Sequence, residues 1–184
     1  MNSTISTTPA LGRYRYESVG NSVTFIDGTT NMSVASIDGE YATRFLAVME
    51  HREQDSYNCF GAADFLRGAS MRLSYPENMR KIEKPVIDIL KTIRSSALPL
   101  LVQVIGDAHD PILGSNGRKW KMDVAIHAGI LIGHSEIDAL LVLEKDGMAP
   151  MKVTPWPEMY GRYFPGTTTR IGKEIRIADM NATN

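Results

Sequence analysis

The segment from residue 123 to residue 147 constrains the fold more than any other part of the chain. It reads DVAIHAGILIGHSEIDALLVLEKDG, in which a β-branched run stops at Gly133, a polar stretch occupies 134–138, and a second apolar run begins at Ala139. Two apolar runs of β-forming residues on either side of a short polar turn are typical of paired antiparallel strands. The segment therefore predicts a β-hairpin.

A histidine stands inside the first of these runs, where folding does not need one. If the turn covers 134–138, His127 lies roughly opposite position 145, give or take one residue. Either Glu144 or Asp146 is then its neighbour, because a shift of one residue reverses which side chain shares its face. We therefore expect a base and the carboxylate that orients it to lie side by side.

The only cysteine of the chain, Cys59, precedes His127 in the segment SYNCFGAADFL. The apolar spacing after it predicts a mostly buried helix, which Asn58 or Ser56 could cap. A cysteine in the first turn of a helix lies at the positive end of the helix dipole, beside unpaired backbone N–H groups, and both favour the thiolate. Cys59, His127 and Glu144 are thus candidates for nucleophile, base and orienting group in acyl transfer.

The alternative is structural. Free cysteine is often a small apolar core residue, and a histidine in a sheet can be held by ordinary hydrogen bonds. On that interpretation Cys59 and His127 have no chemical role, and the chain is a binding or structural protein.

A family resemblance bears on this choice. The string HAGILIG, followed by a hairpin and ALLVLEK, resembles the histidine strand of papain-like cysteine peptidases and amidases of the bacterial NlpC and CHAP type. In that superfamily the cysteine lies earlier, at the start of a helix packed on the sheet, and YNCFGAADFL is similar in placement. The resemblance extends from Asp55 to Tyr163. The Asp-Cys-Ser-Gly of the cell-wall branch is replaced here by Asn-Cys-Phe-Gly at 58–61.

The resemblance implies a hydrolase that cleaves an amide bond through a thioester and needs no cofactor. It implies Cys59 as nucleophile, His127 as base and then acid, and Glu144 as orienter. The backbone N–H of Cys59 would be one oxyanion donor, and Tyr57 and Asn58 are further candidates for oxyanion or substrate contacts. The implied substrate is a peptide or peptidoglycan, and a cognate inhibitor protein is a candidate partner. A protease or acyltransferase that acts on partner proteins, such as an effector, is a further alternative.

Metal binding is an alternative role for His127. Asp107, His109 and Asp110 lie in one loop, and His127 and His134 follow, so carboxylate and imidazole ligands are available. The spacing matches no strong metal motif, and Asp beside Gly and Pro is typical of turns. We assign no metal site.

Composition removes several classes of function. Hydrophobic residues make up 43% of the chain, charged residues 22%, and the net charge is −1. Such a balance offers no basic excess for nucleic acid, and no Gly-rich phosphate loop is present. One cysteine allows no internal disulfide. No apolar run is long enough to span a membrane, and the first residues lack a secretory signal. We expect a protein that is cytoplasmic as synthesised, so a cell-wall enzyme would depend on lysis or specialised secretion.

The remaining pattern predicts an α+β domain, with helices packed on an antiparallel sheet. We expect a flexible arm over 1–12 and a single papain-like domain over 13–184. The other expected elements are an edge ribbon over 13–19 and 22–27, helices over 41–51, from 59 and over 76–95, a strand over 98–106, a short strand over 151–154, a short helix within 155–166 and a last strand over 173–178.

Overall fold

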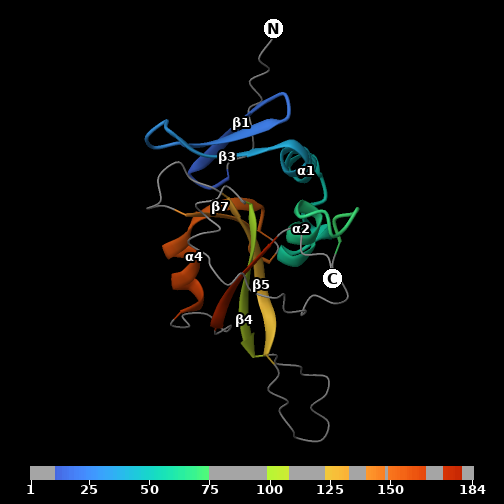
Figure 1. Ribbon diagram of the computed structural model, residues 1–184, viewed down its shortest axis with the longest axis vertical. Coiled ribbons are helices and arrows are strands. Elements are labelled where there is room, and N and C mark those ends of the chain that lie inside the picture. The colour runs from blue at the N-terminus through green and yellow to red at the C-terminus, as the bar shows by residue number, and fades with distance from the viewer. Residues whose placement is uncertain are drawn as a thin grey trace, which may run out of the picture.

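The computed structural model describes residues 11–74, 99–107, 123–132, 140–147, 149–164 and 172–179. These residues form an α+β structure, as the sequence predicts, and their strands make two antiparallel sheets (Figure 1). The elements in chain order are β1 (Tyr14–Val19), β2 (Ser22–Asp27), β3 (Ser33–Asp38), α1 (Gly39–Glu50), the 3-10 turn η1 (Gln54–Ser56), α2 (Cys59–Leu66), β4 (Leu100–Asp107), β5 (Asp123–Ile132), β6 (Leu141–Lys145), β7 (Met151–Pro155), α4 (Trp156–Tyr163) and β8 (Gly172–Asp179).

The smaller sheet has the order β1-β2-β3. Its first hairpin is the predicted one, and Val19 pairs with Ser22 across a turn in which Gly20 has a φ of 59°. The ribbon was expected at an edge; β1 is an edge strand, but β2 is central, because β3 pairs with it along its length. The strand SVASID was missed because its inward residues are the small Ala35 and a single Ile37, which give a weak alternating signal.

The larger sheet has the order β7-β6-β5-β4-β8. The predicted hairpin is present, since β5 and β6 are antiparallel neighbours, with Gly129 opposite Glu144 and Ile132 opposite Leu141. The strands predicted near 98–106, 151–154 and 173–178 are β4, β7 and β8. The hairpin lies at the centre of this sheet.

Alternate residues of the larger sheet enter two different cores. Ile130 and Leu143 pack with α1, α2 and the smaller sheet, whereas Leu131 and Val142 pack with Met159 and Tyr163 of α4. Figure 1 shows α2 and α4 on opposite sides of the strands. Because successive side chains of a strand point to opposite faces, β5 and β6 present different side chains on each face of the sheet.

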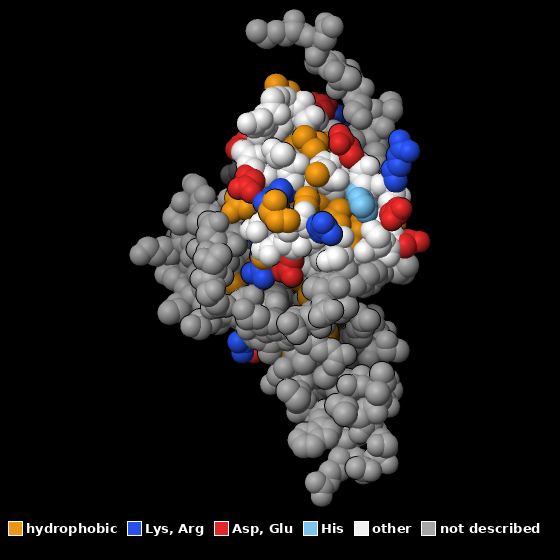
Figure 2. Space-filling model, turned by 90° about the vertical axis from the view of Figure 1, so that its right-hand side faces the viewer, with side chains coloured by type: hydrophobic (Ala, Val, Ile, Leu, Met, Phe, Trp, Pro, Cys, Tyr) orange, Lys and Arg blue, Asp and Glu red, His pale blue; other side chains and the backbone are white. Residues whose placement is uncertain are grey.

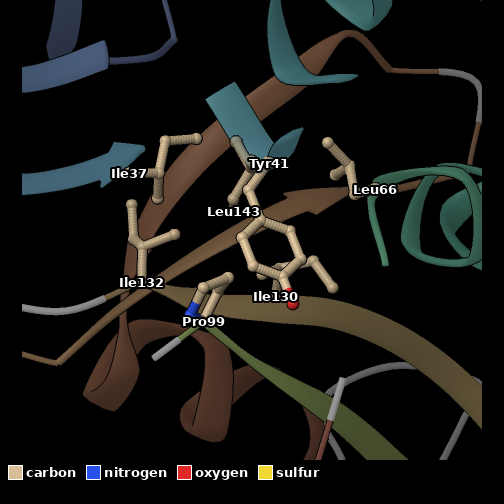
Figure 3. A pocket seen from close by; sticks show the side chains of 7 residues that line it. All are labelled: Ile37, Tyr41, Leu66, Pro99, Ile130, Ile132 and Leu143. Atoms are coloured by element: carbon tan, nitrogen blue, oxygen red, sulfur yellow. The ribbon is translucent and has the colours of Figure 1, made fainter. Parts of the chain in front are cut away.

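An apolar pocket lies in the first core, between the two sheets. Figure 3 shows its walls, which come from β3, α1, α2, β5 and β6 and from the residue before β4. The lining side chains are Ile37, Tyr41, Leu66, Pro99, Ile130, Ile132 and Leu143. The pocket is lined at the Leu66 end of α2 and not at the end where Cys59 lies.

The outer surface carries mixed charge. On the face shown in Figure 2, the described Lys and Arg side chains alternate with Asp and Glu around small apolar areas. This mixture agrees with the net charge of −1. In the part of the chain that the structure describes, no helix is long and apolar enough to cross a membrane.

The structure bears on one part of the predicted N-terminal arm and leaves other predicted segments untested. Leu11, which we expected in the flexible arm over 1–12, is fully buried, belongs to the first core and accepts a hydrogen bond from the backbone N–H of Val153. The rest of the arm and the predicted helix over 76–95 lie outside the described residues.

Candidate functional site

Helix α2 begins at Cys59. Asn58 is its N-cap, and the Asn58 side chain accepts a hydrogen bond from the backbone N–H of Gly61 at 2.9 Å. Gly61 also lets the helix lie close to its neighbour, since a Cβ there would fall 1.8 Å from the carbonyl oxygen of Ser74. The cap and this close contact fix the position of the first turn, and with it the cysteine.

His127 lies beside a β-bulge in β5. Val104 of β4 pairs with His127 and Ile105 pairs with Ala125, so Ile126 is an extra residue in the ladder. A bulge bends a strand and redirects the side chains next to it. His127 is buried and stacks on the Tyr163 ring of α4, with ring centroids 5.2 Å apart.

Glu144 reaches His127 diagonally across the hairpin. The distance from His127 Nε2 to Glu144 Oε2 is 2.7 Å. The residue directly opposite Glu144 is Gly129, where an added Cβ would lie 3.3 Å from the Cβ of Glu144 and 2.7 Å from a methyl group of Val142. Glycine at this position therefore leaves the space through which the carboxylate extends toward the imidazole.

Cys59 completes this row of side chains. It lies near enough to the His127 ring to raise the pKa of that ring by hydrogen bonding and by charge. Cys59 is 5% exposed, His127 2% and Glu144 1%, so the three side chains interact with little screening by water.

Other cations hold the far side of the Glu144 carboxylate. The Arg162 guanidinium of α4 donates to Glu144 Oε1 and also to Asp146 at 3.2 Å. The ammonium of Lys152 lies 3.9 Å from the same Glu144 oxygen. Glu144 is thus an acceptor from two sides, which satisfies a buried carboxylate and keeps it ionised.

These contacts change the pKa values of the pair. Burial lowers the pKa of His127, but the hydrogen bonds and charges of Cys59 and Glu144 outweigh it and raise that pKa to about 9. Burial raises the pKa of Glu144, but His127 and Arg162 outweigh it and lower that pKa to about 2. Near neutral pH, the imidazole is therefore a cation held between a carboxylate and a sulfur atom.

The other predicted site residues have different positions. Asp146 was the alternative orienter, but it lies on the surface and pairs with Arg162. Tyr57 was considered as a substrate contact, but its side chain is fully buried in the first core, with its ring against His51. Asn58 caps α2. His109, Asp110 and His134 of the metal hypothesis lie outside the described residues, as does the side chain of Asp107.

Three residues of the site were missed in the sequence. Arg162 and Tyr163 lie in a helix that was predicted, but nothing in its pattern indicates which face of the sheet it covers. Lys145 follows Glu144 in a charged stretch at the end of the strand. Such a stretch is usually on the surface, yet Lys145 is fully buried. Only the alternation of a two-sided strand could have indicated that neighbouring charges enter opposite cores.

Within the described ranges, no group of three or more His, Cys, Asp or Glu side chains could hold a metal ion. Comparison of the chain with protein-family models, with curated proteins and with solved structures finds no match.

Proposed function

We propose that the protein is a cysteine-dependent hydrolase that cleaves an amide bond through a thioester. The proposal depends on one observation above all: His127 is hydrogen-bonded to Glu144 at 2.7 Å, and Cys59 lies near enough to the same ring to raise its pKa. Each member has the residue type and the position that nucleophilic catalysis needs, with a nucleophile next to a base and the base oriented by a third group.

The chemistry follows from the charges. The Cys59 sulfur, with its proton on His127, attacks the carbonyl carbon of the amide and forms a C–S bond. His127 then gives that proton to the amide nitrogen as the C–N bond breaks, which releases an amine and leaves the acyl group on sulfur. A water molecule attacks the thioester, His127 takes one of its protons, and the acid leaves as the C–S bond breaks. The net reaction is amide plus water to acid plus amine.

The start of α2 supplies an electrostatic contribution. The N–H groups of a first helical turn have no partner within the helix, and they carry the positive end of the dipole. The N–H of Cys59 belongs to this turn, which places a donor next to the carbon that its own sulfur would attack. Such a donor is suited to the oxyanion of a tetrahedral intermediate.

The family proposal concerns the fold and the substrate. A cysteine at the start of a helix, a histidine on a strand of an antiparallel sheet, and a carboxylate on the next strand agree with a papain-like arrangement. We extend the proposal to peptides or peptidoglycan as substrates, on the sequence resemblance to NlpC and CHAP amidases. A protease of partner proteins would use the same three residues.

Alkylation of Cys59 tests the proposal. We expect iodoacetamide at about pH 6 to modify native Cys59 about 10 times faster than it modifies the protein unfolded in denaturant, because thiolate is the reactive form. Incubation with p-nitrophenyl acetate should also leave an acetyl group on Cys59, detectable by mass spectrometry, and Cys59→Ser should remain unmodified. A native thiol that reacts no faster than the unfolded one, in a protein that takes up no acetyl group, would mean that Cys59 is a core residue.

A further inference from the structure

Arg162 lies in the last turn of α4, and the proposed reaction does not use it. Its side chain is 21% exposed. One terminal nitrogen of the guanidinium donates a hydrogen bond to Glu144 Oε1, and the other donates to Asp146 at 3.2 Å. Such charge-assisted bonds from a planar group are strong and fixed in direction. The guanidinium therefore joins α4 to two carboxylates, one within β6 and one directly after it.

The plane of the Glu144 carboxylate is not fixed by its own side chain. The last torsion of a glutamate side chain is broad, so the carboxylate turns easily unless a partner holds it. Here His127 Nε2 contacts Oε2, and Arg162 donates to Oε1. Because both oxygens belong to one rigid plane, a guanidinium that holds Oε1 also directs Oε2 at the imidazole.

Lys152 is another cation beside the same oxygen, but its contact differs. Its ammonium lies 3.9 Å from Glu144 Oε1, beyond the usual hydrogen-bond length of about 2.7 to 3.2 Å. An ammonium at that distance contributes charge, but it does not direct the carboxylate as the fixed donors of a guanidinium do. Of these two cations, Arg162 is the one that can orient Glu144.

The next residue of α4 contacts the histidine itself. The Tyr163 ring stacks on the His127 ring, with centroids 5.2 Å apart and an angle of 26° between the planes. Tyr163 is buried in the second core with Leu131 and Val142, so the last turn of α4 is packed against β5 and β6. Consecutive residues of one helix thus contact both members of the buried pair.

We infer that Arg162 is a positioning residue, which holds the Glu144 carboxylate in the orientation that accepts a hydrogen bond from His127 Nε2. The inference rests on the proposed function, since the orientation of His127 matters only if it transfers protons. An ionised carboxylate can only accept, so Nε2 must be the donor. Keeping this bond in place fixes the tautomer of the imidazole whenever it is neutral.

Steady-state hydrolysis of p-nitrophenyl acetate tests this role. We expect Arg162→Ala to lower kcat about 10-fold and to leave KM within about twofold, because the arginine acts on the base and not on the substrate. Arg176→Ala is the matched control, since Arg176 forms a 2.9 Å pair with Glu174, is 29% exposed and lies on β8, three strands from β6. It should keep the wild-type kcat and KM. An unchanged kcat in Arg162→Ala, or a change in KM alone, overturns the inference.

A double-mutant cycle separates positioning from a purely structural contribution. If Arg162 acts through Glu144, it has no carboxylate to orient in Glu144→Ala. Adding Arg162→Ala to that variant should then change kcat by less than about twofold. A structural arginine would instead lower kcat by the same factor in both backgrounds, and that result overturns the inference.

Arg162→Lys covers the case in which Arg162→Ala does not fold. It keeps a positive charge beside Glu144 but removes the planar donors, so we expect kcat to fall about three- to tenfold. Lys152→Ala, which removes a charge without removing a hydrogen bond to Glu144, should lower kcat less. A wild-type kcat in Arg162→Lys overturns the inference. The two proposals fail differently: a wild-type protein without turnover and with an unreactive Cys59 removes both, whereas normal turnover in the Arg162 variants removes only the role of the arginine.

Discussion

Ion pairs in the two sheets differ in where their charges lie. In the smaller sheet, Arg15 and Glu17 form a 2.6 Å pair whose side chains are 45% and 58% exposed. In the larger sheet, His127 and Glu144 form a 2.7 Å pair whose side chains are 2% and 0% exposed. The two distances are nearly equal, yet the solvent around the pairs is not. The distance between two charges alone therefore says little about what an ion pair contributes to stability or to function.

The difference lies in desolvation. Exposed pairs contribute about 0 to 1 kcal/mol, because water screens them and the long side chains lose entropy. A buried pair costs several kcal/mol per ion to remove from water, and fold stability alone rarely requires it. Replacing a buried ion pair by well-packed apolar residues is often neutral or stabilising. A buried charged pair such as His127 and Glu144 is expected where the charges serve a reaction. Substitutions can test this.

The largest effect on turnover is expected from His127→Ala. The imidazole is the only described group placed to accept and return the proton, so hydrolysis of p-nitrophenyl acetate should fall by about 100- to 10,000-fold. Release of p-nitrophenol under steady-state conditions measures it. The smaller-sheet variant Arg15→Gln, assayed in parallel, should keep the wild-type rate. Equal rates in His127→Ala and the wild type would assign the buried pair to folding alone.

Glu144 should have the largest effect on stability. Glu144→Ala leaves Arg162 and His127 without their acceptor, and breaking a buried pair in this way costs about 3 to 5 kcal/mol. Urea unfolding at pH 6 measures the loss. Glu144→Gln keeps the size of the side chain, and it should reduce turnover less than His127→Ala does, because an orienting group only stabilises the imidazolium. A loss below 1 kcal/mol in Glu144→Ala would show that the buried pair behaves like a surface pair.

Some features of the fold and of the candidate site could be predicted from the sequence, and others could not. The hairpin, the start of α2 and the pairing of His127 with a carboxylate could be predicted, because each depends on local pattern: apolar runs, a cap residue and a turn length. The choice between Glu144 and Asp146 could not, since it depends on the bulge at Ile126 and on the space at Gly129. The partner Arg162 and the burial of Lys145 depend on which elements cover each face of the sheet, which is tertiary information. Strand β3 was missed because small residues carry little periodic signal.

The pH dependence of stability should show both members of the buried pair. The folded pKa of His127 is raised to about 9, so its contribution is complete below about pH 6.5 and is lost as the pH rises through 9. The folded pKa of Glu144 is lowered to about 2, so its contribution is present above about pH 4.5 and is lost as the pH falls through 2. The melting temperature should therefore be highest between about pH 4.5 and 6.5.

Differential scanning fluorimetry across pH 3 to 9 measures this profile. His127→Gln should lose the decline on the alkaline side, and Cys59→Ala should make that decline shallower, because the sulfur is one reason for the raised pKa of His127. An alkaline decline that is the same in all three proteins would assign it to other groups.

Asp146→Asn should have a smaller effect. Asp146 lies on the surface and pairs with Arg162 at 3.2 Å, but the same guanidinium also binds Glu144. Because Glu144 holds Arg162 by itself, we expect a loss of at most about 1 kcal/mol in urea unfolding, and a turnover within about twofold of the wild type. A loss of turnover as large as that in Glu144→Gln would mean that the exposed carboxylate takes part in orienting His127, and that the contrast between buried and exposed groups is less sharp than the distances indicate.

The smallest effect is expected at the exposed pair itself. Arg15→Gln and Glu17→Gln should each change the free energy of unfolding by no more than about 0.5 kcal/mol, and the double variant should show almost no coupling energy, because both side chains are well solvated. High salt should remove what coupling remains. The matching cycle for the buried pair, with His127→Gln and Glu144→Gln, should give a coupling energy several times larger that persists in high salt, since water and ions do not reach it. If the two cycles gave equal coupling, burial would not be what distinguishes the two pairs. The reason for assigning chemistry to His127 and Glu144 would then rest on the interaction of His127 with Cys59 alone.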